Sequence, residues 1–480
     1  MKTFFMLTMA LVLMAAVPSA QAKNDLKLIY FDGHIHTTHS DGSGSIADVK
    51  QVAKERGLNA VIITNHTKQI ADMNEWNDIV GQCRTLSEKE FLMIPAFEVT
   101  GSEGLFCRDH VLAWGVDTPF VGEPADALAP EEVWESPENP FGTGPMAPEV
   151  IRQWTDWIHE NRGIAVHAHT TGTTQLGYNV DYIEVINLSH TKDVARFAQM
   201  AGFSAGEAWN LGVLFNSFAI FGDEYLQLPI DMPNPYYGQP GQPMTIQLPL
   251  QQALYMGTSL IGDMGENSGG AQWLGTPTPQ TLLDQGATPA APLNSWDDLL
   301  LAYIDGKIDH PIFGVANSDA HNTANIIIGS TGNDDSDVGE AKNGVYLHKF
   351  NKFQFAKAIR RGNLFATTGP SLYFDVNGEI MGETVQLGHK KNKKVKLNLR
   401  VNSENPAATL AVVSIIKNGE ILFREEPMSP TYELELEDTV TGNGYYRVEV
   451  TSMDISDGRP RFAFGNPVFV KLACSKGTKP

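Results

Sequence analysis

A histidine-rich stretch follows the apolar run Leu26–Phe31, and it reads Asp32-Gly-His-Ile-His-Thr-Thr-His-Ser-Asp-Gly42. An apolar run that stops at Asp-Gly predicts a short buried strand that enters a loop. His34 and His36 are two residues apart, so both side chains leave the same face of an extended backbone. Two imidazoles at this spacing suit one divalent transition metal, and Asp41 adds a carboxylate nearby. A plain polar loop is the alternative, so the interpretation depends on the rest of the chain.

The composition is that of a folded protein. The 480 residues are 42% hydrophobic and 19% charged, which predicts a sizeable core and argues against wholesale disorder. This length accommodates one large domain with a smaller one, or two to three domains of ordinary size. Cysteine occurs at Cys83, Cys107 and Cys474, too few for a disulfide framework. A single bridge between Cys83 and Cys107 stays open as an alternative.

The chain is acidic, and this limits the partners that it can bind. Its 35 basic and 56 acidic residues give a formal net charge of −21. A surface for nucleic acid or an anionic membrane needs a basic patch that releases counterions, so we expect neither partner. An anionic small molecule is not excluded, because bound metal ions set the local field at a site.

The first 22 residues have the pattern of a signal peptide. Lys2 supplies a positive start, Phe4–Val17 is apolar but too short to span a bilayer, and Ala20-Gln21-Ala22 is a small-x-small cleavage site. No later stretch is long and apolar enough to span a membrane, and no cysteine follows the cleavage site to carry a lipid anchor. We therefore expect an exported protein, periplasmic or secreted, without a membrane anchor.

Helix-like and strand-like segments alternate along most of the chain. Apolar residues recur at helical spacing in Ile46–Arg56, Ile151–Arg162 and Trp296–Ile304. The apolar runs between them are typical of buried strands, and ligand-type side chains lie in or beside them. These runs are Leu58–Thr64 before His66, Phe91–Phe97 before Glu98, Val111–Val116 after His110, Ile164–Val166 before His167 and His169, Tyr182–Leu188 around Glu184 and before His190, and Ile312–Ala316 before Asp319 and His321. The alternation predicts an α/β fold, and ligand residues at strand ends fit a TIM-like barrel.

Two regions depart from this alternation. Residues 203–293 are rich in Gly, Pro, Gln and Asn and predict an insertion over one face of the barrel, which spans residues 23–370. The sequence leaves open whether the insertion is a lid or a plain surface excursion. From Ser371 onward, short alternating strands predict an all-β sandwich at 371–472, followed by a tail at 473–480.

The polar motifs occur in an order typical of one superfamily. They are Asp32-Gly-His-Ile-His36, Ile63-Thr-Asn-His66, Ala96-Phe-Glu98, Ala168-His-Thr170, Ile183-Glu-Val185 and Asn317-Ser-Asp-Ala-His321. This order resembles the polymerase and histidinol phosphatase (PHP) superfamily, over residues 28–370 apart from the insertion. Two later motifs, Ala358–Pro370 and Gly465–Val470, resemble its branch with carbaryl-type carbamate hydrolases. The resemblance implies a distorted (β/α)7 barrel and a metal-dependent hydrolase.

The resemblance also implies a set of metal ligands. His34, His36, Glu98 and Asp319 would hold a first ion, Glu98 with His110 and His169 a second, and Asp41, His66 and His321 a third. Zn, Mn and Fe all suit these ligands, so two to three such divalent ions are the expected cofactors. A water between two ions loses a proton near neutral pH and becomes the nucleophile. Glu98, Asp319 and His169 are the expected catalytic residues, while Arg108 and Asp109 leave a salt-bridged loop open for His110.

Five further residues are candidates for supporting the ligands or contacting a substrate. His167 lies two residues before a predicted ligand and shares its face, and Glu184 is a mid-strand carboxylate that needs a partner. His190 and Thr368 are weaker candidates, with loop roles as the alternative. Arg361 is either a phosphate contact or an ordinary partner of a helix dipole.

The predicted function is metal-dependent hydrolysis of a small-molecule ester, with a phosphodiester ahead of a phosphomonoester. A carbamate or a carboxyl ester is the second substrate class. The alternative of another kind is a metal-dependent protein that binds a glycan or a protein without turnover. The chain lacks the Gly-Lys-Ser/Thr, Gly-x-Ser-x-Gly and Cys-x-x-Cys motifs, so P-loop, serine-triad and redox chemistry have no support.

Overall fold

The computed structural model describes residues 26–99, 110–116, 148–168, 174, 176–187, 225–230, 244–249, 288–289, 296–321, 338–388, 393–454 and 460–473. Some predicted features lie outside this part of the chain. They are the signal peptide at 1–22, most of the 203–293 insertion, Cys107 and Cys474, residues 474–480 of the tail, and the candidates His169 and His190. Within the insertion the structure describes three strands, β7 (Tyr225–Ile230), β8 (Met244–Pro249) and β9 (Thr288–Pro289), which pair in the order β8-β7-β9.

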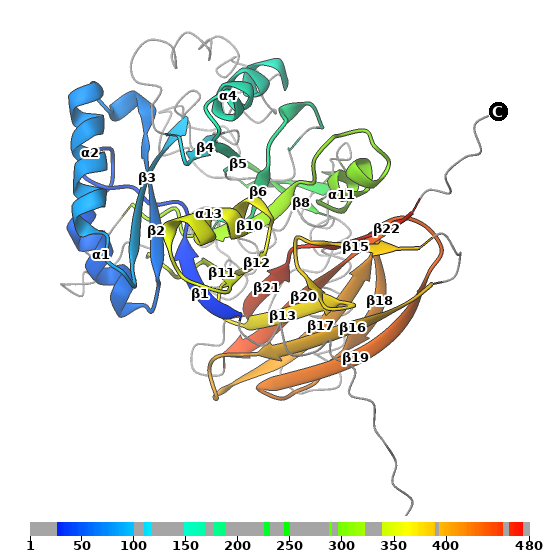
Figure 1. Ribbon diagram of the computed structural model, residues 1–480. Helices are drawn as coiled ribbons and strands as arrows, with labels where there is room; N and C mark the ends of the chain where they lie inside the picture. Colours follow the sequence, from blue (N-terminus) through cyan, green and yellow to red (C-terminus); the bar gives the residue numbers. More distant parts are fainter. Residues whose placement is uncertain are drawn as a thin grey trace, which may run out of the picture.

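One large mixed sheet organises the chain up to residue 370 (Figure 1). Its strands, in spatial order, are β10 (Phe313–Asn317), β6 (Tyr182–Asn187), β5 (Ile164–His167), β4 (Val111–Trp114), β3 (Leu92–Val99), β2 (Ala60–His66), β1 (Lys27–Asp32), β11 (Lys342–Leu347) and β12 (Leu364–Thr367). The pairs β1–β2, β2–β3, β5–β6 and β6–β10 are parallel. The runs that form β2, β4, β5, β6 and β10 are buried almost throughout, as expected for strands covered on both faces.

The direction of β4 decides where His110 lies. β4 runs antiparallel to both β3 and β5, and Val111 at its start is paired with Val99 at the end of β3. Because the strand is reversed, the residue that precedes it lies at the same edge as the residues that follow parallel strands. His110 therefore reaches the edge where Glu98 lies next to the last residue of β3.

The predicted distorted (β/α)7 barrel is not confirmed. The described strands form a mixed α/β sheet in which β4 and β11 are antiparallel to their neighbours, and these two strands interrupt the β/α alternation. The sheet nevertheless curves so that its first strand, β10, approaches β11: Ala316 N–H donates to the Asn343 side chain (2.8 Å), and Ile35 and Ala320 form a parallel bridge. The structure thus supports the α/β class and one curved sheet.

Few helices accompany the sheet in the described ranges. They are α1 (Ile46–Glu55), α2 (Met73–Leu86), α4 (Pro148–Glu160), α11 (Trp296–Ile304) and α13 (Lys352–Arg360), with 3₁₀ turns η2 (Thr67–Gln69) and η4 (Leu176–Tyr178). α1 and α2 pack on β2 and β3 (Figure 1). α1 begins at a capping box, in which Ser45 Oγ accepts from Asp48 N–H (3.2 Å) and the Asp48 carboxylate accepts from Ser45 N–H (2.9 Å). This cap fixes the exit of the histidine-rich loop.

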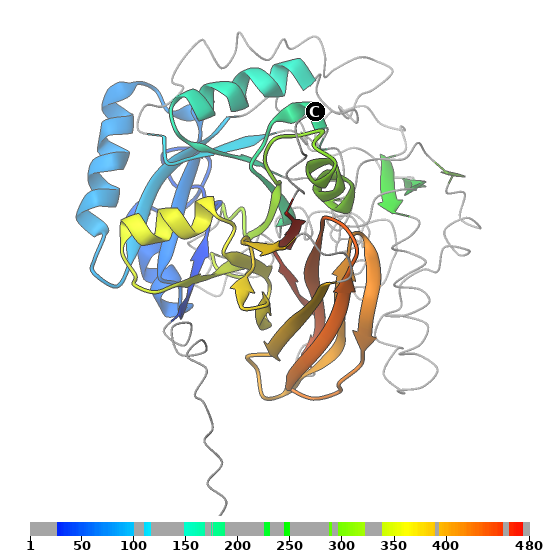
Figure 2. The same ribbon diagram turned by 45° about the vertical axis from the view of Figure 1, so that its right-hand side comes forward.

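The C-terminal region is rich in β-strands (Figures 1 and 2). One layer has β14 (Glu379–Ile380), β13 (Ser371–Val376), β16 (Lys393–Asn402) and β19 (Thr431–Val440). The other has β21 (Pro460–Gly465), β20 (Gly444–Asp454), β17 (Ala408–Lys417) and β18 (Glu420–Glu425), with β15 (Thr384–Leu387) and β22 (Val468–Leu472) at its side. Leu397 and Leu399 of β16 share one buried core with Val413 of β17 and Val448 of β20, as in two packed sheets.

The large sheet continues into this region. β12 pairs with β21, with Thr367 opposite Ala463, so the predicted boundary at residue 370 is crossed by backbone pairing. A second connection lies at α11, where Asp297 accepts hydrogen bonds from Arg447 Nε (2.7 Å) and from the Tyr445 hydroxyl (2.6 Å). Tyr445 belongs to the core of the large sheet. The two regions are therefore joined through the sheet, a buried ion pair and the core.

Two further observations concern α2 and membrane insertion. Cys83 on α2 is buried, and no disulfide joins it to another residue in the part of the chain that the structure describes. Among the described helices, none has both the length and the apolar character needed to cross a bilayer.

Candidate metal centre

Eight of the nine predicted ligands come together at one edge of the large sheet. They are His34, His36, Asp41, His66, Glu98, His110, Asp319 and His321. All except Asp319 belong to three overlapping groups, and within each group the donor atoms lie within 4.8 Å of one another. Asp319 joins one of these groups through its contacts with His34 and His36. They lie at the ends of β2 and β3, follow β1 and β10, or precede β4. The ninth, His169, lies outside the described residues.

The innermost group is built from β1, β3 and β10. The Nε2 atoms of His34 and His36 lie 3.0 Å apart, and each is 3.2 Å from Asp319 Oδ1. Glu98 Oε2 lies 3.2 Å from His34 Nε2 and 3.3 Å from His36 Nε2. All four side chains are buried. Four donor atoms are thus directed at one small volume.

Glu98 also connects this group to a second one. Its Oε1 atom lies 2.8 Å from His110 Nδ1, while Oε2 lies 3.0 Å from His66 Nδ1. One carboxylate therefore presents each of its oxygens to a different imidazole. His66 was predicted only for the third group, and the structure places its two nitrogens between the second and third groups.

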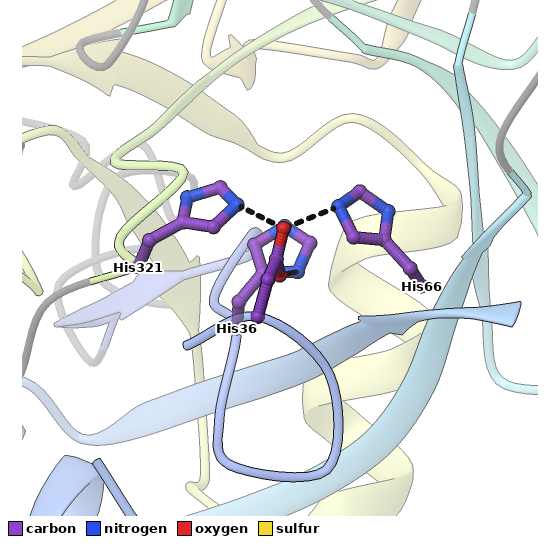
Figure 3. Close-up of side chains that lie close together, drawn as sticks. His36, His66 and His321 are labelled. Carbon is purple, nitrogen blue, oxygen red and sulfur yellow. Dashed lines mark ion pairs between the residues drawn. The ribbon is translucent and has the colours of Figure 1, made fainter. Parts of the chain in front are cut away.

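The third group is centred on Asp41 and is the most open to solvent. Asp41 Oδ2 lies 3.3 Å from His66 Nε2 and 3.4 Å from His321 Nε2, and Oδ1 lies 3.4 Å from His36 Nδ1. Figure 3 shows the three imidazoles converging on this carboxylate. The Asp41 side chain is 40% exposed, whereas Glu98 is fully buried. The group therefore lies at the solvent side of the centre.

The donor atoms fit divalent metal ions better than they fit each other as hydrogen-bond partners. His66 Nδ1 is buried and makes no hydrogen bond, although Glu98 Oε2 is 3.0 Å away. Ligands at about 2.0–2.1 Å in a tetrahedral site are separated by about 3.3 Å. The separations from Glu98 and Asp319 to the two buried histidines, 3.2–3.3 Å, match this value. Buried nitrogen and carboxylate oxygen together form a donor set that suits Zn, Mn or Fe.

Opposite charges keep His34 and Glu98 ionised. Burial alone would lower the pKa of His34, but the charges of Asp319, Glu98 and Glu184 outweigh it and raise that pKa well above its usual value. Burial would raise the pKa of Glu98, but the surrounding histidines, His34 foremost, hold it well below its usual value. For His36, burial and the neighbouring imidazolium groups both lower the pKa. The carboxylates are therefore charged and ready to bind a cation.

The outer histidines hold protons firmly. Burial would lower the pKa of His66, but the charge of Glu98 and the hydrogen bond to Asp41 raise this pKa to about 10. Against the same effect of burial, Asp319 and Asp41 raise the pKa of His321 to about 9. Burial acts on Asp41 too, but its hydrogen bonds with His321 and His66 hold its pKa far below the usual range. A metal ion at this position has to displace these protons.

The backbone around Asp319 is fixed from several sides. Asp319 has φ +54°, a left-handed conformation that is uncommon for a residue with a side chain. Asp32, fully buried, accepts from Ser318 N–H (3.1 Å) and Gly339 N–H (2.8 Å), and burial raises its pKa to about 6. Ala320 O in turn accepts from His36 N–H (2.9 Å). The strained conformation that aims Asp319 at the histidines is therefore held by its neighbours.

Two of the five supporting candidates are buried within the sheet. Glu184 Oε1 lies 2.9 Å from His34 Nδ1, on the side of the ring away from the other ligands. His167 at the end of β5 is buried, with Nδ1 2.7 Å from Thr174 Oγ1 and its ring against Tyr178. His190 is outside the described residues.

The other two candidates, Arg361 and Thr368, make their described contacts away from the donor groups. Arg361 caps the C-terminus of α13, pairs with Glu383 at 3.3 Å, and lines a cavity of about 360 Å³. These contacts favour the helix-dipole alternative for Arg361. Thr368 pairs β12 with β21, because its hydroxyl accepts from Phe462 N–H (2.9 Å). Both lie in the motif Ala358–Pro370, which contains β12, and β12 pairs with β21 of the C-terminal region.

The sequence reasoning missed Asn187. Its Nδ2 atom donates to Glu184 Oε2 (2.8 Å) and lies 3.3 Å from Asp319 Oδ2. The signal available was its position three residues after Glu184 at the end of the same strand, but an amide has no metal-ligand pattern that would single it out.

Comparisons with known proteins give weak structural likenesses only. No protein-family model and no curated protein sequence matches the chain. A two-domain protein from Bacteroides vulgatus, described as containing a predicted PHP-like metal-dependent phosphoesterase, covers 94% of this chain and 96% of its own at 10% identity and a TM-score of 0.35. An amidohydrolase from Chromobacterium violaceum covers 36% of this chain and 82% of its own at 18% identity and a TM-score of 0.22. At these scores the likenesses assign neither a family nor an activity.

Proposed function

We propose that this chain is a metal-dependent hydrolase whose centre holds two to three divalent ions. The observation that carries the proposal is the position of Glu98, whose two carboxylate oxygens face different imidazoles at 2.8 and 3.0 Å. A buried carboxylate arranged in this way suits a bridge between two ions. Structural ion pairs also place histidine near carboxylate, but they do not need three overlapping groups at one edge of a sheet.

The residues divide into roles according to their surroundings. His34, His36, Glu98 and Asp319 would hold the inner ion, Glu98 with His66 and His110 the second, and Asp41 with His36, His66 and His321 the outer one. Such ions supply Lewis acidity and lower the pKa of a water. Glu98 and Asp319 provide the negative charge that binds the ions, and the backbone bonds to Asp32 and Ala320 keep Asp319 oriented. The more exposed Asp41 group lies where a substrate enters from solvent.

For the substrate we propose a phosphate ester. Several neighbouring cations can neutralise the non-bridging oxygens of a phosphoryl group and stabilise both the attacking and leaving oxygens. The resemblance to carbamate hydrolases depends in part on the segment that contains Arg361 and Thr368. The described contacts of these two residues are with Glu383 and Phe462 of the C-terminal region, away from the metal ligands. No described contact therefore favours a carbamate over a phosphate ester.

The test is turnover by the chain after metal removal and reloading with Mn, Zn or Fe. We would supply a chromogenic phosphodiester, phosphomonoester, carboxyl ester and aryl carbamate in parallel, with an Asp319→Asn variant as control. Metal-dependent cleavage of a phosphate ester that the variant lacks supports the proposal. Cleavage of the carbamate or carboxyl ester alone would replace the substrate class. Metal binding without turnover of any of the four would favour the non-enzymatic alternative.

We also propose that the protein is exported. The proposal rests on the positive, apolar and small-residue pattern of residues 1–22. N-terminal sequencing of protein recovered from the periplasm or the medium should begin at Lys23, and an intact Met1 in recovered protein would contradict export by this route.

A further inference from the structure

Glu184 occupies an unusual place for a carboxylate. It lies in the middle of β6, paired with Val315 of the neighbouring strand β10, and it is 1% exposed. A charged side chain at such a position is costly unless all its hydrogen-bonding capacity is used. Both carboxylate oxygens of Glu184 have hydrogen-bond partners.

The contact to His34 defines the direction of that imidazole. Glu184 Oε1 lies 2.9 Å from His34 Nδ1, while His34 Nε2 lies 3.2 Å from both Glu98 Oε2 and Asp319 Oδ1. The two ring nitrogens therefore face opposite environments. One faces a carboxylate that belongs to no donor group, and the other faces the innermost group.

Two asparagines require Glu184 to be an acceptor. Gly33 N–H can only donate, and it lies 3.0 Å from Asn317 Oδ1, so this contact identifies which amide atom of Asn317 is the oxygen. The other amide atom, Nδ2, therefore donates to Glu184 Oε1 (2.8 Å). Asn187 Nδ2 donates to Glu184 Oε2 (2.8 Å). Because both oxygens receive N–H donors, the shared proton belongs on His34 Nδ1, and Nε2 is the nitrogen that faces the donor group and is left to bind a metal ion.

We propose that Glu184 is a positioning residue that fixes the tautomer and orientation of His34 for metal binding, with Asn187 and Asn317 holding the carboxylate. The inference rests on the proposed metal-dependent function and adds a residue outside the ligand set. A carboxylate behind a ligand imidazole raises its basicity and removes the freedom of the ring to turn. Asn187 Nδ2 also lies 3.3 Å from Asp319 Oδ2, so the same amide connects the support of two ligands.

Glutamine at position 184 cannot reproduce these contacts. Its amide has one acceptor oxygen, and the nitrogen would face an N–H donor from Asn187, or from Asn317 and His34 if the group turned over. The change keeps the size of the side chain, so it tests the hydrogen bonds rather than the packing. A matched control is Asp375→Asn in β13, because Asp375 is also buried and accepts from Gly378 N–H (2.7 Å) and Asn398 Nδ2 (2.9 Å), far from the centre in the sequence.

The experiment measures zinc binding by calorimetry and the tautomer of His34 by ¹⁵N NMR on the full chain, with no substrate present. We expect Glu184→Gln to bind zinc about 10- to 100-fold more weakly. We also expect the Nδ1–H signal of His34, which is assigned by its absence in His34→Gln, to shift or be lost in this variant. Asp375→Asn should bind zinc as the wild type does. Wild-type affinity and an unchanged His34 signal in Glu184→Gln would overturn the inference and leave the metal centre intact.

Two further outcomes are separated by design. If the wild type binds neither zinc nor manganese, the proposed function and the inference fail together. If Glu184→Gln does not fold, as judged by circular dichroism, then Asn187→Ala decides, because it removes one donor to Glu184 without altering His34 or its carboxylate partner. Because Asn187 Nδ2 also contacts Asp319 Oδ2, the deciding measurement for this variant is the Nδ1–H signal of His34. A shift or loss of that signal in Asn187→Ala supports the inference, and an unchanged signal contradicts it.

Discussion

Glu98 Oε1 lies 2.8 Å from His110 Nδ1 at the edge where β3 ends and the reversed strand β4 begins. The other oxygen of the same carboxylate faces His34, His36 and His66 at 3.0–3.3 Å. One side chain therefore touches every donor group of the centre except the Asp41 group, which it reaches through shared histidines. Glu98 therefore contacts four of the candidate ligand imidazoles.

Replacing Glu98 with glutamine should weaken metal binding at the two proposed sites that share this side chain. The Glu98→Gln change keeps the volume of the side chain but removes the charge and one acceptor. We therefore expect metal affinity to fall about 10- to 100-fold and turnover to fall by at least about 100-fold. Metal content and initial rates on the reloaded protein measure both effects. Glu383→Gln, at a partly exposed ion pair with Arg361, is the control and should behave as the wild type.

The protons on the outer histidines make metal binding depend on pH. The pKa values of His66 and His321 are raised to about 10 and about 9, so at neutral pH both rings carry a proton that a metal ion must displace. Affinity should therefore rise as the pH is raised from about 6 towards 9, with release of protons. Calorimetry of zinc binding in two buffers of different ionisation enthalpy measures this release, and equal heats in the two buffers would contradict it.

The Asp41 group should lose its ion first. Asp41 and His321 are 40% and 30% exposed, whereas Glu98 and His34 are fully buried. A chelator should therefore remove one equivalent rapidly and the rest slowly. His321→Gln should lack the rapid phase and keep the slow one, as measured by metal release over time. A single phase with the full metal content in His321→Gln would place the outer ion elsewhere.

The pair Asp297–Arg447 should be important for stability. Arg447 is 1% exposed, and Asp297 binds its Nε atom at 2.7 Å, so Asp297→Ala would leave a buried cation short of a partner. We expect a loss of about 3–5 kcal/mol in the free energy of unfolding. Urea denaturation measures it, with Asp305→Ala as the control, because Asp305 is half exposed and its pair with Lys307 contributes little. Equal stabilities of the two variants would contradict the assigned role.

Sequence reasoning located the donor groups because ligand residues in strands have a fixed geometry. His34 and His36 leave one face of an extended segment, and the end of a parallel strand brings Glu98 and His66 to the same edge. The direction of β4 was not predictable, because an apolar run looks the same whether its strand is parallel or reversed. His110 nevertheless lies with the other donors, since the reversal brings the start of β4 to that edge.

The remaining differences have a common cause in long-range pairing. Arg361 and Thr368 belong to one motif that the sequence associates with the site. In the structure, β12 of this motif pairs with β21, nearly a hundred residues later, and the Thr368 hydroxyl accepts from Phe462 N–H at this junction. The same pairing connects the two predicted domains. Removing residues from Ser371 onward should therefore expose the edge of β12 and destabilise the rest, although the sequence predicts a sandwich that begins at residue 371.

The most direct test of the metal centre is a titration of the metal-free chain with manganese or zinc, followed by bound metal and turnover of a chromogenic phosphodiester at each step. We expect binding of two to three equivalents, with turnover that appears as the sites that include Glu98 fill and that is absent in Glu98→Gln. A wild-type protein that binds no divalent metal, or whose turnover is the same before and after metal removal, would contradict it.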